Sequence, residues 1–144
     1  MTDTLERVER PLTGEFWAAV DRGELVRPVC GACGSSFFVP QIACPHCQST
    51  DWTYQPSSGR GVVYSHSVVH RPPDEAFEAP YVIAIVDVAE GWHLMTWIVD
   101  VDPSEVVIGM EVEVRFVTGP DGARLPAFAP SAPSVSESPE EDTR

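Results

Sequence analysis

The sequence predicts an all-β protein with one short N-terminal helix, in which a metal-binding ribbon precedes a barrel of five strands. Two Cys-x-x-Cys pairs, ten residues apart, lie in the first third of the 144-residue chain. Five short apolar segments separated by turn signals follow them, and only one segment of the chain has convincing helical periodicity. Short strands without covering helices favour a closed barrel, because closure protects strand edges that would otherwise pair with other chains.

The helix is predicted after Thr13, which can cap its first turn, and Gly23 is a natural stop. Helical spacing places Phe16, Trp17 and Val20 on roughly one side. Three strand-like segments of the ribbon follow, and they cover residues 25–29, 37–39 and 52–56.

The barrel strands are predicted from β-type apolar segments bounded by Gly and Pro turns. Residues 111–116 alternate polar and apolar, which is the period of a strand with one buried face. The five predicted strands cover residues 60–70, 81–88, 92–101, 111–116 and 124–128.

We therefore divide the chain into four parts. After Pro130 the sequence is rich in Pro, Ser and Glu and has hardly any apolar side chains, so it cannot offset the entropy lost on ordering. The predicted parts are an N-terminal arm and helix (1–24), a zinc ribbon (25–56), a barrel domain (57–129) and a disordered acidic tail (130–144).

The charge of the chain argues against a nucleic-acid partner. The formal net charge is −13, and all nine basic residues are Arg, since the sequence contains no Lys. A nucleic-acid-binding barrel would normally carry a basic stripe, and none is visible. The missing Lys also means that this chain cannot supply the Schiff-base amine of many aldolases. No apolar run could span a membrane and no export signal is present, so we expect a cytoplasmic protein.

The four cysteines have the spacing of a tetrahedral metal site. Each Cys-x-x-Cys pair can direct two thiolates towards one point, and two pairs complete a four-sulfur shell around structural Zn²⁺. The alternatives are disulfides, a redox-active pair and bound iron. Disulfides are typical of exported chains and a redox pair normally lies at the start of a helix, so both are disfavoured here. Iron in place of zinc stays an open alternative. A closed shell leaves no position for a catalytic water, so His46 is not needed as a ligand. The predicted ligands are Cys30, Cys33, Cys44 and Cys47.

The barrel sequence offers scattered candidates for chemistry but no catalytic motif. His66, His70 and His93 could act as acids or bases with Asp or Glu partners, although a packing or solvent-exposed role is the more common one for a lone His. Strand alternation would place His66 and His70 on one face. Guanidinium groups match phosphate oxygens, so four barrel arginines are candidates for the phosphates of CoA, and surface ion pairing is the alternative. These are Arg60, Arg71, Arg115 and Arg124.

Several short motifs occur in a characteristic order over residues 11–130. In these motifs the sequence resembles the acyl-CoA-associated proteins that combine a zinc ribbon with an OB fold. This family was long described as a domain of unknown function. One departure is Gln41 after Pro40, where family members commonly have Arg, which weakens any phosphate contact from that loop. The matching residues are Thr13, Phe16-Trp17, Gly23-Glu24-Leu25, Cys33-Gly34, Cys44-Pro45, Trp52, Ser58-Gly59-Arg60-Gly61, Ala79-Pro80-Tyr81, Glu90-Gly91, Ile108-Gly109-Met110 and Leu125-Pro126-Ala127-Phe128.

The resemblance implies a rubredoxin-like zinc ribbon, a C-terminal OB-fold barrel and a role as an accessory subunit. Such proteins pair with a thiolase-like or sterol-carrier-type lipid-transfer protein, which carries the catalytic residues. In some pairs the complex is an acyl-CoA retro-aldolase of steroid side-chain breakdown; in others the small subunit bridges two enzymes and helps to hold CoA. A hetero-oligomer with two copies of each chain is the expectation. The resemblance implies that the four cysteines are zinc ligands, and it assigns no catalytic residue to this chain.

Three hypotheses follow. The first is a non-catalytic subunit of a thiolase-like aldolase or acyltransferase, which is inactive alone. A related form of this hypothesis is a CoA-binding scaffold that bridges a thiolase or a hydratase. The second is a single-stranded nucleic-acid-binding OB protein, which the negative charge opposes. The third is a stand-alone enzyme that uses His66 or His93 as its base.

Overall fold

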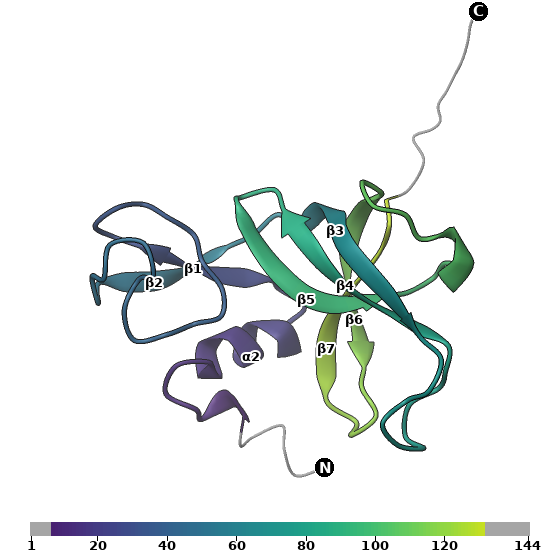
Figure 1. The fold of residues 1–144 in the computed structure, drawn as a ribbon. Coiled ribbons are helices and arrows are strands. Elements are labelled where there is room, and N and C mark those ends of the chain that lie inside the picture. The colour runs from purple at the N-terminus through teal and green to yellow at the C-terminus, as the bar shows by residue number, and fades with distance from the viewer. Residues whose placement is uncertain (1–6, 132–144) are drawn as a thin grey trace, which may run out of the picture.

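The computed structural model describes residues 7–131 as a ribbon and a barrel joined side by side, with a short helix beneath them (Figure 1). Helix α2 (Gly14–Asp21) begins at Thr13, as predicted, but the Thr13 side chain makes no capping hydrogen bond. The helix ends before Gly23, whose φ of 80° and N–H bond to the Val20 carbonyl (2.9 Å) turn the chain away. None of the helices among these residues is both long and apolar enough to cross a bilayer.

The ribbon is built on one antiparallel pair, β1 (Val26–Cys30) and β2 (Trp52–Pro56). A strand at residues 37–39 was predicted, and this prediction is wrong. Only Ser36 forms a bridge, to Val29, and the chain then bends. Phe37 and Phe38 follow each other but join different apolar clusters, Phe37 that of the cysteines and Phe38 that of the barrel. The apolar character of this segment therefore comes from loop side chains that fill two clusters, and not from a strand.

The barrel has the five predicted strands and is closed in the order β3-β4-β5-β7-β6. Strands β3, β4, β5 and β6 pair antiparallel with their neighbours, and β7 joins β5 in parallel through Ile98 and Phe128. A 3₁₀ helix, η1 (Pro103–Glu105), precedes β6 and was not predicted. The strand bounds are Arg60–Val69 for β3, Tyr81–Val88 for β4, Trp92–Ile98 for β5, Glu111–Thr118 for β6 and Arg124–Pro130 for β7.

The barrel core is formed by every second residue of the strands, because these side chains point into the barrel. Strand β4 shows this alternation along its whole length, with Val82, Ala84, Val86 and Val88 buried. Helix α2 adds Phe16, Ala19 and Val20, and the base of the ribbon adds Leu25 and Val26 to the same cluster. The fold is therefore a zinc-ribbon domain followed by a five-stranded OB-fold barrel, and the ribbon base and the barrel share one core. Residues 132–144 of the predicted tail lie outside the described residues.

Candidate metal centre

The two Cys-x-x-Cys segments form two turns with the same backbone hydrogen bonds. In the first, the N–H of Gly34 donates to the Cys30 carbonyl (2.9 Å). In the second, the N–H of Gln48 donates to the Cys44 carbonyl (2.8 Å). The residue after each pair takes a left-handed conformation, with φ of 79° at Gly34 and 69° at Gln48. Sequence reasoning identified the turn glycine of the first pair but missed Gln48, although it occupies the same place after Cys47.

The four sulfur atoms lie within 4.8 Å of one another at the tip of the ribbon. The Cys30 and Cys47 sulfurs are 3.6 Å apart, and those of Cys33 and Cys44 are 3.8 Å apart. A tetrahedral ion with metal–sulfur bonds of about 2.3 Å requires sulfur–sulfur distances of about 3.8 Å. The arrangement of the thiols therefore fits a single tetrahedral metal ion.

Backbone amides around the sulfurs favour the thiolate form that a metal needs. The N–H of Ala32 donates to the Cys30 sulfur and that of His46 to the Cys44 sulfur, both at 3.3 Å. Such bonds spread the thiolate charge and orient metal ligands. The Gly31 N–H donates to the Asp51 carbonyl (2.6 Å), and a Cβ at Gly31 would lie 2.8 Å from an Asp51 carboxylate oxygen, so a larger residue here would require Asp51 to shift.

The thiols of Cys33 and Cys47 have pKa values shifted in opposite directions. The pKa of Cys33 is lowered to about 6 by its hydrogen bonds with the Ser35 side chain and backbone. The backbone amide of Ser49 lowers the pKa of Cys47, but the neighbouring thiols, first Cys30, and burial outweigh it and raise the value to about 12. Because negative sulfurs this close repel one another, four thiolates can coexist only around a positive ion.

A small apolar cluster lies under the sulfurs. Cys30, Phe37 and Cys44 are at least 96% buried, and Trp52 packs on them with its ring 5.6 Å from that of Phe37. The Trp52 indole N–H donates to the Ile42 carbonyl (3.2 Å). His46 is exposed and is not among the grouped metal-ligating residues.

The four barrel arginines are not gathered into one phosphate site. Arg60 starts β3 and Arg71 follows its far end, so the length of the strand separates them. Arg115 lies 3.6 Å from Glu113, and its guanidinium donates to the Val114 carbonyl. Arg124 donates to the Asp21 carbonyl of α2 at 3.0 Å. Two of the four are thus paired within the chain.

The histidines do not form a catalytic group. His93 lies 3.2 Å from the Asp87 carboxylate on the outer face of the barrel, where both side chains are exposed. His66 is half-buried in β3, whereas His70 lies beyond the strand end and is exposed, so the expected shared face is not formed. The acid–base candidates are therefore spread over the surface.

Comparisons with known proteins agree with this architecture. The profile of the ChsH2 rubredoxin-like zinc ribbon domain matches residues 17–53, and that of the ChsH2 C-terminal OB-fold domain matches residues 54–117. A probable enoyl-CoA hydratase alpha subunit of Thermomonospora curvata is 40% identical over 82% of this chain. The 3-oxo-4,17-pregnadiene-20-carboxyl-CoA hydratase alpha subunit of Mycobacterium tuberculosis is 37% identical over 76% of it. The chain spans only 37% and 35% of these two relatives.

A solved structure corresponds over nearly its full length. A chain of the Ltp2-ChsH2(DUF35) aldolase is 36% identical and superimposes with a TM-score of 0.78, covering 85% of this chain and 97% of that one. The chain therefore belongs to the ChsH2 (DUF35) family, in which a rubredoxin-like zinc ribbon precedes an OB-fold domain.

Proposed function

We propose that this chain is the non-catalytic accessory subunit of a thiolase-like acyl-CoA enzyme, and that the enzyme is a retro-aldolase acting on a steroid or similar acyl-CoA side chain. The observation that carries the proposal is the correspondence of 85% of this chain to 97% of a chain of the Ltp2-ChsH2(DUF35) aldolase. The relative from M. tuberculosis, named for a pregnadiene carboxyl-CoA, supports the steroid substrate class.

The chemistry belongs to the partner in this proposal. In a retro-aldol step the β-hydroxyl of a hydroxyacyl-CoA loses its proton and the bond between its α and β carbons breaks. The β carbon becomes a carbonyl, and the α carbon of the shortened acyl-CoA takes up a proton. This chain has no Lys for a Schiff base, and its one His–carboxylate pair in the described part, His93 and Asp87, is exposed to solvent. It therefore contributes a surface rather than acid–base groups.

We infer that Cys30, Cys33, Cys44 and Cys47 hold one structural Zn²⁺. The sulfur separations of 3.6 and 3.8 Å support this inference. With four protein ligands the ion has no open position, so its role is to stabilise the ribbon. Metal analysis of the purified protein distinguishes zinc from iron, because an iron tetrathiolate is coloured and redox-active whereas Zn²⁺ is neither. We place the protein in the cytoplasm, where thiols stay reduced and available to a metal.

The test is co-expression of the full chain with each thiolase-like protein of its own genome. The copurified complex is then assayed for cleavage of a β-hydroxyacyl-CoA, and each component is assayed alone. We expect a complex with two copies of each chain that is active only when both are present. Activity of this chain alone, or absence of any complex, would contradict the proposal.

A hydratase partner is the second candidate, because two relatives are named as hydratase alpha subunits. The same co-expression with a hydratase-like protein, assayed for hydration of an enoyl-CoA, separates the two.

A further inference from the structure

Six apolar side chains form a strip on the outside of the barrel along β4 and β5. Cross-strand pairing sets Ile85 opposite Met95 and Ile83 opposite Trp97, while the residues between them face the core. Met95 is 70% exposed, an unusual position for a large apolar residue. We call this set the β4–β5 strip, and it consists of Phe77, Tyr81, Ile83, Ile85, Met95 and Trp97.

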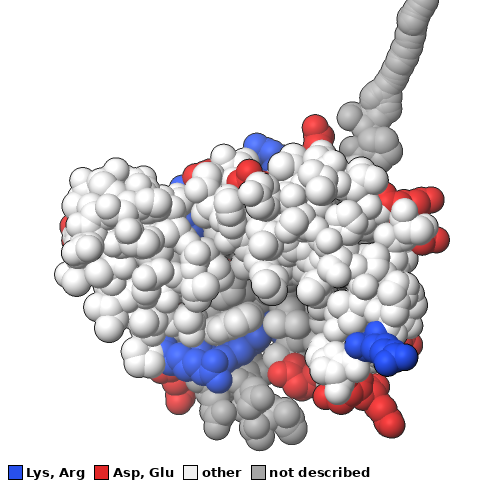
Figure 2. Space-filling view, in the orientation of Figure 1, with Lys and Arg blue, Asp and Glu red and all other residues white. Residues whose placement is uncertain are grey.

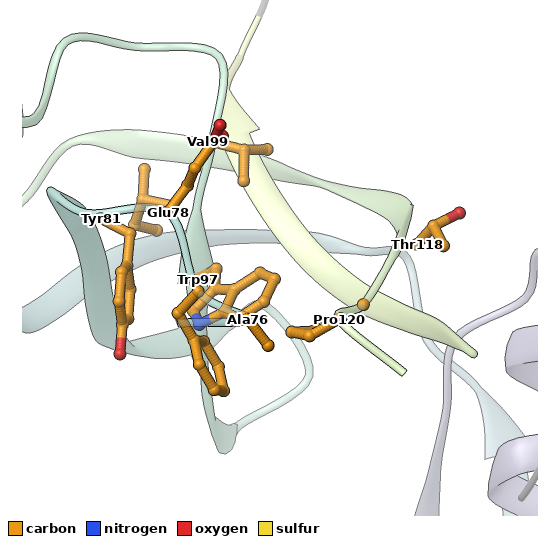
Figure 3. Close-up of a pocket in the computed structure, with 10 residues that line it drawn as sticks. Ala76, Glu78, Tyr81, Trp97, Val99, Thr118 and Pro120 are labelled. Carbon is orange, nitrogen blue, oxygen red and sulfur yellow. The ribbon is translucent and has the colours of Figure 1, made fainter. Parts of the chain in front are cut away.

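The strip borders three hollows on the surface of the described residues. The first, of about 250 Å³, lies between the loop at Ala76 and the loop at Pro120, with the rings of Tyr81 and Trp97 as one wall (Figure 3). The second, of about 260 Å³, lies between α2 and β5, and is lined by Met95 and Trp97 together with Trp17. A smaller one lies beside β3. The apolar surface is thus both continuous and indented.

The position of the strip is the usual ligand-binding place of the fold. OB barrels bind their ligands on the face of the second and third strands, between the loop after strand one and the loop between strands four and five. In this barrel these are β4, β5 and the loops at residues 70–80 and 119–123. The first hollow lies between these two loops.

The chemistry of the strip fits a protein surface rather than a polyanion. The strip carries no charged side chain, although the chain has a net charge of −13. Figure 2 shows that the front face over β5 and the ribbon is largely uncharged, with acidic residues and a few arginines around its edge. Cores of protein–protein interfaces are depleted in charge and enriched in Tyr, Trp, Phe and Met, which is the composition found here.

We propose that the β4–β5 strip is the surface on which the catalytic partner protein docks, with an apolar side chain of the partner filling the hollow between Ala76 and Pro120. This inference rests on the proposed function only in requiring such a partner. The loop bordering the hollow carries Asp74, Glu75 and Glu78, all exposed. Charge complementarity therefore calls for Lys or Arg around the apolar anchor of the partner.

The test is binding of the purified full chain to the partner protein that copurifies with it. Met95→Glu places a charge in the middle of the strip without disturbing the core, since the side chain is exposed. We expect its affinity to fall by about 30-fold or more, as for a change at the centre of an interface. Ala76→Trp fills the hollow from an exposed loop position and should lower the affinity by about tenfold, or roughly 1.4 kcal/mol.

The matched control is Ile108→Glu, which makes the same charge change at a side chain that is 69% exposed and lies before β6, outside the strip. It should bind like the wild type. Unchanged affinity of Met95→Glu, or an equal loss in Ile108→Glu, would overturn the docking surface while leaving the accessory role intact. If the wild-type chain binds no thiolase-like or hydratase-like protein, both proposals fail. If it forms a dimer that Met95→Glu dissociates, the strip binds a second copy and the partner assignment is wrong.

Discussion

The ribbon tip and the barrel are stabilised in different ways. The barrel buries a cluster that runs through all of its strands and includes Val86, Val112 and Phe128 at 0% exposure. The apolar cluster at the ribbon tip has just three buried members, Cys30, Phe37 and Cys44, with Trp52 packed against them. So few apolar side chains cannot order a segment of this length, and small units of this kind depend on a metal or a disulfide.

The boundary between the two regions lies within the ribbon, not between ribbon and barrel. Leu25 and Val26, at the base of β1, belong to the barrel cluster, and Tyr54 of β2 packs against it. The Tyr54 hydroxyl also donates to the Leu12 carbonyl before the helix (2.5 Å). We therefore expect a metal-dependent tip beyond these residues and a metal-independent base that stays with the barrel.

The largest effect expected from this difference is that of Cys30→Ser. It removes one ligand, so the metal should dissociate and the tip should unfold, with a loss on the order of 10 kcal/mol of metal-binding free energy. Metal content and amide signals in a ¹H–¹⁵N NMR spectrum measure this: signals of the tip should disappear, while those of the barrel remain. His46→Ala is the control and should keep its metal, because His46 is exposed. Full metal content in Cys30→Ser would refute the ligand assignment.

The converse change is Phe128→Ala in the barrel. Phe128 is fully buried where β7 meets both β6, at Val114, and β5, at Ile98. Removing the ring should lower the free energy of unfolding by about 3–5 kcal/mol. Urea denaturation gives this value, and the folded variant should still bind one metal per chain. Loss of the metal at urea concentrations where the barrel is still folded would show that the tip depends on the barrel core, against the comparison drawn above.

The barrel and the clustering of the four cysteines were predictable from sequence because each has a local signal. Strand β4 alternates buried and half-buried residues over its whole length, and the cysteine spacing indicates a tetrahedral site before any fold is known. The strand predicted at residues 37–39 failed because apolar character alone does not distinguish a strand from a loop whose side chains fill a core. Phe37 and Phe38 enter different ones.

What could not be predicted depends on pairing between distant segments. Met95 and Trp97 point outward because of the register in which β5 pairs with β4, and this register cannot be read from the sequence. The separation of Arg60 from Arg71, by contrast, could have been inferred, because the strand predicted at residues 60–70 lies between them. Gln48 was predictable in principle, since it repeats the position of Gly34 in the second Cys-x-x-Cys turn.

A smaller effect is expected at the joint between the ribbon base and the barrel. The Glu90 carboxylate accepts hydrogen bonds from the Ser57 hydroxyl (2.6 Å) and the Ser58 N–H (2.9 Å), and the Trp92 indole donates to the same hydroxyl (3.3 Å). Burial alone would raise the pKa of Glu90, but these hydrogen bonds outweigh it and lower the pKa below its usual value of 4.5. Glu90→Gln should therefore cost about 1 kcal/mol at neutral pH.

The sign of the pH dependence follows from the lowered pKa. The stabilisation by Glu90 is complete above the unfolded-state pKa and is lost as the pH falls through the lower folded-state pKa. The difference in unfolding free energy between the wild type and Glu90→Gln should thus be constant from pH 6 to 8 and shrink below about pH 4. Thermal unfolding at matched pH measures it. A difference that grows on acidification would contradict the assigned hydrogen bonds.

The smallest effects compare the two cysteine turns with each other. Gly34 has φ of 79° and nothing within 4 Å of an added Cβ, so Gly34→Ala tests backbone strain alone. It should lower the stability of the tip by about 1 kcal/mol. Gln48 already has this strained conformation, with φ of 69°. Gln48→Gly should therefore raise the stability of the tip by about 0.5 kcal/mol. Competition for the metal with a chelator compares the two variants. Changes of the same sign would mean that side-chain contacts of Gln48, rather than its backbone conformation, decide the stability of the second turn.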